Sequence, residues 1–187
     1  MRKLDKPLFF FGILLILAGL IWSVVVPAPT VVQKTPSPVA TNSAVLGAKN
    51  YQEAEVIRVV DGDTIHIQLD NKEEIVRFIG VDAPEVVDPR KKAQCFGKEA
   101  SNFTKNMLNG KKIILEEDAS QGNRDKYNRL LRYVFLEDGT NFNKLLIQEG
   151  YAHEYTYRLP YRYQVEFKEA QKQAESHKKG LWADNAC

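Results

Sequence analysis

The sequence VVDGDTIHIQLDNKEEIVRFIGVDAPE, residues 59–85, contains the features that decide the fold of this chain. Apolar and polar residues alternate over 64–69, which is typical of a half-buried β-strand. The Asp-Gly pair at 61–62 separates this run from the apolar residues before it and indicates a hairpin turn. A second turn at 70–72, followed by a strand over 74–81, predicts three consecutive antiparallel strands that form a curled meander.

The same stretch concentrates acidic side chains around one arginine. Four carboxylates and one guanidinium could face a single site: Asp61, Asp63, Asp82, Glu85 and Arg77. Carboxylate oxygens bind Ca²⁺ or Mg²⁺, and the guanidinium fork matches phosphate oxygens. Simple alternation would place Arg77 and Asp82 on opposite faces of a strand, although Gly80 between them is a plausible bend. A plain hairpin turn and an exposed polar loop therefore remain alternative interpretations of the two acidic motifs.

The remainder of the chain from residue 51 predicts a small α+β domain. Further strands are expected over 111–117 and 130–136, and helices over 97–108, 141–149 and 160–179, with Gly180 ending the last helix. Five short strands with about three helices predict a five-stranded OB-type β-barrel. This fold alone does not decide the function, because many OB barrels only bind.

The N-terminal part of the chain predicts a membrane segment followed by a linker. Residues 7–26 carry no charge and are long enough to span a bilayer as a helix, and the residues before them are net basic. Residues 1–26 are therefore interpreted as a signal-anchor, 27–50 as a disordered linker rich in Pro, Ala, Ser and Thr, and 51–187 as the folded domain. A signal peptide that is cleaved to release the domain is the alternative. Both interpretations place the domain outside the cytoplasm.

Composition and residue spacing exclude some classes of function. The net charge is only +2, so the whole chain shows no strong electrostatic bias toward nucleic acid. Two cysteines and three isolated histidines do not form the ligand spacing of a zinc enzyme. The acidic turn is not an EF-hand loop, because Lys72 stands where that loop needs glutamate. In an oxidising compartment Cys95 and Cys187 favour a disulfide, with two free thiols as the alternative.

The motifs as a set resemble the staphylococcal nuclease-like (thermonuclease) family. The order VVDGDT, VRFIGVDAPE, GKEASNFTKNML and DKYNRLLRYVF, followed by a closing helix and GLW, is similar to that family over residues 56–184. The resemblance implies a calcium-dependent phosphodiesterase on an OB barrel that acts on DNA and RNA and leaves 3′-phosphates. It implies no protein partner.

The resemblance also implies a role for each matching residue. Asp63 and Asp82 would bind Ca²⁺ with the backbone carbonyl of Ala83, and Asp61 would lie near the metal. Glu85 would act as the general base, and Arg77 and Arg129 would bind the phosphate. The substrate-binding positions would be Lys126, Tyr127, Tyr155 and Tyr157. Asn128 replaces the usual glycine before the arginine, and asparagine tolerates a left-handed backbone better than most residues.

Two other classes of protein remain as alternatives to a nuclease. One is a catalytically silent OB module that binds single-stranded nucleic acid through a basic groove and stacked aromatic rings. The other is a structural domain on the cell surface. Neither alternative needs Asp63, Asp82 and Glu85 beside two arginines, so the acidic set favours the enzyme.

Overall fold

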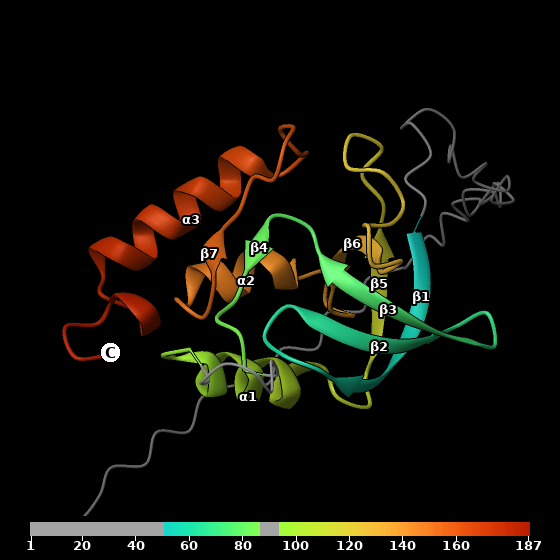
Figure 1. Cartoon of the computed structure of the whole chain (residues 1–187), viewed down its shortest axis with the longest axis horizontal. Coiled ribbons are helices and arrows are strands. Elements are labelled where there is room, and N and C mark those ends of the chain that lie inside the picture. Colours follow the sequence, from blue (N-terminus) through green and yellow to red (C-terminus); the bar gives the residue numbers. More distant parts are fainter. Residues whose placement is uncertain (1–50, 87–93) are drawn as a thin grey trace, which may run out of the picture. The chain divides into compact units, whose positions relative to one another are not determined.

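Five strands close into a barrel in the computed structural model, which describes residues 51–86 and 94–187 (Figure 1). The barrel strands are β1 (Tyr51–Val59), β2 (Thr64–Leu69), β3 (Lys72–Phe78), β5 (Lys112–Glu116) and β6 (Leu130–Phe135), in the order β1-β2-β3-β6-β5. The predicted α+β fold with a five-stranded barrel is confirmed. The predicted membrane segment and linker lie outside the described residues. Within the two described ranges, no helix has the length and apolar character needed to cross a membrane.

The predicted meander is the first half of the barrel. β1 pairs antiparallel with β2, and β2 pairs antiparallel with β3. β3 then pairs in parallel with β6, starting from Val76 opposite Leu130, and β5 lies antiparallel to both β6 and β1. Closure in this way pairs every barrel strand on both sides, so the barrel presents no open sheet edge.

Alternation along the strands fills the barrel with apolar side chains. Ile65 and Ile67 on β2 are fully buried, whereas Gln68 between Ile67 and the next buried residue is exposed. The buried side chains of the other strands include Val56, Val76, Phe78, Ile113, Leu115 and Val134. Residues at alternate positions of a strand point to the same face, so the period-two pattern of β2 directs Ile65, Ile67 and Leu69 into this core.

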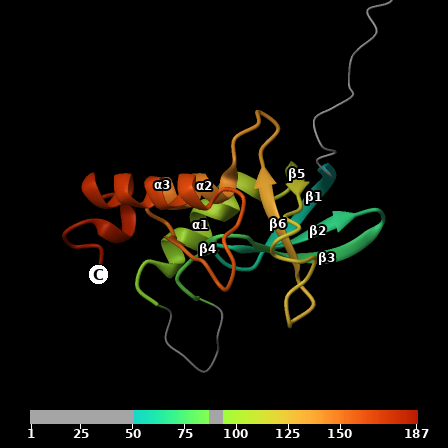
Figure 2. The same ribbon diagram turned by 90° about the horizontal axis from the view of Figure 1, so that it is seen from above.

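Three helices gather at one side of the barrel (Figure 1, Figure 2). They are α1 (Gly97–Leu108), α2 (Phe142–Gln148) and α3 (Gln164–Ser176), and a short 3₁₀ turn, η1 (Gly180–Trp182), follows α3. In α1 the buried Ala100, Thr104 and Leu108 recur every four residues and form one face. The Asn141 side chain accepts a hydrogen bond of 3.1 Å from the backbone N–H of Lys144 and caps α2.

The ends of the last helix differ from the prediction. α3 begins at Gln164 rather than Pro160, because a side chain just after β5 holds the segment before the helix: buried Asp118 accepts the backbone N–H of Arg162 at 2.8 Å. Its last turn ends at Ser176. Lys178, with φ of 51°, takes the left-handed position after the helix, and Lys179 N–H bonds back to the Ala174 carbonyl at 2.9 Å. Gly180 belongs to the following 3₁₀ turn and is not the cap.

Candidate active site

A cavity of about 510 Å³ opens where the β1–β2 turn, β3, the segment after it and two loops meet. Its lining residues are Asp61, Asp63, Thr64, Arg77, Asp82, Ala83, Glu85, Gln94, Tyr127 and Arg129. All four predicted carboxylates and both predicted arginines are among them. The stretch that defines the fold therefore also supplies most of the cavity wall.

Asp63 is the most buried carboxylate of the cavity, with 5% of its surface exposed. One of its oxygens forms an ion pair of 2.7 Å with Arg77 Nη1 and accepts the backbone N–H of Ala83 at 2.7 Å. The other oxygen accepts the hydroxyl of Thr64 at 3.0 Å. Burial raises the pKa of Asp63 to about 7, and the Arg77 guanidinium opposes this rise by stabilising the ionised carboxylate.

Arg77 and Asp82 converge because the chain bends between them. β3 ends at Phe78, and Gly80 adopts a φ of +75° that a residue with a side chain rarely takes. The bend brings Arg77 Nη2 to 3.2 Å from an Asp82 oxygen, and Arg77 Nη1 also donates to the Val81 carbonyl at 2.8 Å. The opposite-face arrangement that simple alternation suggested is therefore wrong, and the plausible bend at Gly80 is confirmed.

The turn that holds Asp61 and Asp63 is fixed by its own side chain and by α1. Asp61 accepts the backbone N–H of Asp63 at 3.1 Å, and the Thr104 hydroxyl of α1 donates to the Gly62 carbonyl at 2.7 Å. A Cβ atom at Gly62 would lie 2.6 Å from the Cβ of Ala83, so only glycine permits this close approach. The hairpin turn is thus real, and it also presents two carboxylates to the cavity.

Glu85 lies just after the two-residue strand β4 (Val81–Asp82) and is held by Gln94. Its backbone N–H donates to the Gln94 side-chain oxygen at 2.8 Å, and its carbonyl accepts the Gln94 backbone N–H at 2.9 Å. One carboxylate oxygen of Glu85 accepts the backbone N–H of Val86 at 3.1 Å. The sequence did not single out Gln94, and nothing in the local pattern distinguishes it. Thr64 was also missed, although it directly follows Asp63.

Arg129 reaches the cavity from the loop between β5 and β6, where Asp125 orients it. The Asp125 carboxylate accepts Arg129 Nε and Nη2, both at 2.7 Å, and the backbone N–H groups of Tyr127 and Arg129, both at 2.9 Å. Burial acts to raise the pKa of Asp125, but the hydrogen bonds and charge of Arg129, together with the Tyr127 N–H, lower that pKa below its ordinary value. The ring of Tyr127 lies 5.4 Å from the Arg129 guanidinium carbon. Asn128 has a φ of 66°, a left-handed conformation that asparagine tolerates better than most residues.

The remaining predicted substrate residues lie outside the cavity wall. Lys126 Nζ is 4.9 Å from the centre of the Tyr127 ring, which is 67% exposed. Tyr155 and Tyr157 are exposed, with ring centres 6.3 Å apart. A small sheet that the sequence did not predict fixes this segment beside the cavity: β4 pairs antiparallel with β7 (His153–Glu154), placing Asp82 opposite His153.

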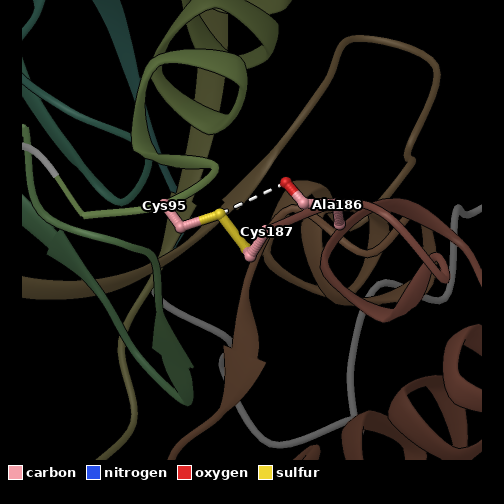
Figure 3. Close-up of a disulfide and its surroundings, with 3 residues drawn as sticks. All are labelled: Cys95, Ala186 and Cys187. Atoms are coloured by element: carbon pink, nitrogen blue, oxygen red, sulfur yellow. Dashed lines mark hydrogen bonds between the residues drawn. A yellow bond between two sulfur atoms is a disulfide. The ribbon is translucent and has the colours of Figure 1, made fainter.

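The two cysteines are joined, as predicted. A disulfide links Cys95 with Cys187, and the Cys95 sulfur lies 3.2 Å from the Ala186 carbonyl oxygen (Figure 3). Cys95 directly follows Gln94 and lies two residues before α1 begins. The C-terminal end of the chain is therefore tied covalently to the segment that holds Glu85.

The charge of the cavity favours binding of a cation. Four lining carboxylates face two lining guanidiniums, so the ionised cavity is net negative and would repel a phosphodiester on its own. Across residues 51–86 and 94–187, no three His, Cys, Asp or Glu side chains form a group that could hold a metal ion. A cation in this cavity would therefore complete its coordination with backbone carbonyl, water or substrate oxygens. Such an all-oxygen donor set fits a hard divalent cation.

Comparison with known proteins agrees with this arrangement. The family described as "Staphylococcal nuclease homologue" matches residues 75–184, which is more than half of the chain. The chain belongs to this family. The match includes Arg77, Asp82, Glu85 and Arg129, whereas the turn with Asp61 precedes it.

Individual relatives of the staphylococcal nuclease family extend the similarity over most of the chain. A thermonuclease of Staphylococcus hyicus is 46% identical over 142 residues, which cover 76% of this chain and 82% of that protein. A thermonuclease of Staphylococcus intermedius is 44% identical over 127 residues, covering 68% and 74%, respectively. The SPbeta prophage-derived endonuclease YokF of Bacillus subtilis (strain 168) is 36% identical over 138 residues, covering 73% of this chain and 46% of that protein.

Proposed function

We propose that this chain is a Ca²⁺-dependent nuclease that hydrolyses phosphodiester bonds of DNA and RNA and leaves 3′-phosphates. One observation carries the proposal: carboxylates and arginines from separate segments of a staphylococcal nuclease homologue line a single cavity. Similarity to proteins named thermonuclease and endonuclease supports the reaction class. Hydrolysis of a nucleic-acid phosphodiester is the chemistry that a negative, cation-accepting cavity with two guanidiniums would serve.

Asp63, Asp82 and the carbonyl of Ala83 would hold the Ca²⁺ ion, with Asp61 nearby. When bound, the ion supplies positive charge to a phosphate oxygen and makes a bound water more acidic. Arg77 already neutralises part of the charge of Asp63 and Asp82 through its two contacts. The cavity thus keeps a positive group beside its carboxylates before any cation enters.

Glu85 is the proposed general base. Its carboxylate lines the cavity and can accept the proton of a water that attacks phosphorus. The new bond forms between that water oxygen and phosphorus, and the bond to the 5′ oxygen breaks. The 5′ oxygen takes a proton from solvent, which leaves the phosphate on the 3′ side.

Arg77 and Arg129 are the proposed phosphate-binding groups. Negative charge grows on the phosphate oxygens as water attacks, and preorganised donors stabilise that charge without reorganising. Arg77 is preorganised by its place on β3 and by the Val81 carbonyl. Arg129 is preorganised by Asp125, which binds its Nε and Nη2. Lys126, Tyr127, Tyr155 and Tyr157 would contact neighbouring parts of the nucleic acid.

Removal of the metal tests the proposal. We expect cleavage of plasmid DNA and RNA to stop in the presence of chelator and to return with Ca²⁺, while Mg²⁺ supports it poorly because it demands a tighter octahedral geometry. Asp82→Asn should weaken Ca²⁺ binding measured by calorimetry. Asp70→Asn is the matched control, because Asp70 lies exposed in the turn between β2 and β3, away from the cavity. Full activity in chelator would overturn the metal assignment.

We further propose that residues 1–26 anchor the nuclease in the cell membrane, with residues 27–50 as a linker and the domain outside the cytoplasm. The uncharged stretch over 7–26, preceded by basic residues, supports this. The full chain should sediment with membranes and be released by detergent but not by high salt. Release of a shortened protein into the medium would instead indicate signal cleavage.

A further inference from the structure

We infer that Gln94 is the positioning residue of Glu85, and that the Cys95–Cys187 disulfide holds Gln94 in place. The inference rests on the proposed function, because it assigns Glu85 as the general base. Gln94 makes two hydrogen bonds to the backbone of Glu85, one through its side-chain oxygen and one through its backbone N–H. Because both the N–H and the carbonyl of Glu85 are bonded to Gln94, the Glu85 backbone can neither rotate nor shift freely.

Glu85 lies outside the barrel strands, in the segment that follows β4. Arg77 lies within β3, and Asp63 is a buried residue of the turn that precedes β2. Glu85 instead follows a strand of only two residues, and the preceding Pro84 has no N–H to donate. Two backbone hydrogen bonds join Glu85 to Gln94.

The first turn of α1 also presses against this segment. A Cβ atom at Gly97 would lie 2.9 Å from Val86 Cγ2 and 3.1 Å from the carbonyl oxygens of Glu85 and Pro84. The start of α1 and the Glu85 segment are therefore in direct contact, and glycine permits that approach. Gln94, Cys95 and Gly97 form one short stretch that meets the backbone of the proposed base.

The disulfide connects this stretch to the helices on the other side. Cys187 follows η1, whose Leu181 N–H bonds to the Gly150 carbonyl at 2.8 Å at the end of α2. Lys179 also pairs with Glu149 at 2.8 Å. The C-terminal segment is thus anchored on the helical layer, and through Cys95 it restrains the residue next to Gln94 (Figure 3).

The inference predicts a loss of turnover without a loss of binding. Residues that orient the ligands of metal sites by hydrogen bonding typically contribute about 10–100-fold to activity, and a misplacement of about 1 Å near a reacting group can cost about 100-fold. Gln94→Leu should therefore lower kcat by about 10–100-fold and leave KM nearly unchanged. Gln94→Glu should restore most of kcat, because a carboxylate oxygen still accepts the Glu85 N–H. Gln68→Leu, at the exposed position of β2, is the matched control and should have no effect.

Amide hydrogen exchange provides a readout that does not depend on activity. In the full chain, the Glu85 N–H should exchange at least about tenfold faster in Gln94→Leu than in the unmodified protein or in Gln94→Glu, because its acceptor is lost. The double variant Cys95→Ser/Cys187→Ser should show a smaller increase in the Glu85 exchange rate and a smaller decrease in kcat, of up to about tenfold. Its activity is measured well below its melting temperature, so that global unfolding does not contribute.

The kcat and amide-exchange results test the role of Gln94 separately from the proposed nuclease function. If the unmodified chain cleaves no nucleic acid but Gln94→Leu still speeds amide exchange at Glu85, the proposed function is wrong. The positioning of the Glu85 backbone by Gln94 is then still supported. If kcat and the Glu85 exchange rate are both unchanged in Gln94→Leu, the positioning role is wrong. If they change in Gln94→Leu but not in the cysteine double variant, the disulfide has no part in holding Gln94.

Discussion

Glu85→Gln should lower kcat by about 10²–10⁴-fold, the usual contribution of a general base, and leave nucleic-acid affinity within about tenfold. Glutamine has the same shape, and its amide oxygen can still accept the Val86 N–H that now bonds to the Glu85 carboxylate at 3.1 Å. It cannot accept the proton of an attacking water. The variant therefore removes the proposed chemistry and preserves the local packing.

Single-turnover cleavage and binding without turnover together measure this effect. Binding is followed with a fluorescent oligonucleotide at fixed salt, because phosphate contacts are strongly salt-dependent. Glu99→Gln is the matched control: Glu99 is exposed in the first turn of α1 and does not line the cavity. An unchanged kcat in Glu85→Gln would remove Glu85 from the reaction.

Arg129→Lys should lower kcat by about 10²–10³-fold, the typical cost of losing one preorganised donor to the transition state. Lysine keeps the positive charge but lacks the planar fork. Asp125 binds two nitrogens of the Arg129 guanidinium and thereby sets the direction of the remaining donors. A single ammonium group cannot bind Asp125 and a phosphate oxygen with the same geometry. Affinity should change little, because one phosphate contact among many contributes modestly.

Arg58→Lys provides the control for this substitution. Arg58 lies exposed on β1, where its Nη2 is 2.8 Å from His66 Nε2, and it does not line the cavity. The same chemical change there should leave kcat within about twofold, because exposed substitutions away from a site have small effects. If Arg129→Lys and Glu85→Gln instead lost binding and cleavage in equal proportion, both residues would be anchoring groups. That result would favour the silent nucleic-acid-binding module.

Elements defined by local periodicity were predictable from the sequence. The three strands of the meander follow from alternation and from turns at Asp61-Gly62 and Asp70-Asn71. α1 was predicted with the bounds that the structure shows, because its apolar residues recur at helical spacing and Asn109-Gly110 follows it. Strand and helix patterns depend on neighbours a few residues away, so the sequence contains the information.

Contacts between distant segments were not predictable in the same way. β4 and β7 have only two residues each, too few to show any period, and they exist because the bend at Gly80 brings one against the other. The start of α3 depends on Asp118, which lies more than forty residues earlier and captures the backbone of Arg162. The sequence around either residue of such a contact contains no pattern that predicts the contact.

The cavity likewise contains some residues that the sequence identified and others that only the tertiary contacts identified. Residues 59–85 by themselves placed carboxylates before and after a strand that contains Arg77, and the family resemblance assigned them roles before any contact was known. Tertiary structure decided that Arg77 faces Asp63 and Asp82 together, because a left-handed glycine reverses the alternation that the strand would otherwise impose. It also selected Gln94, an ordinary polar residue whose importance comes only from where the folded chain places the backbone of Glu85.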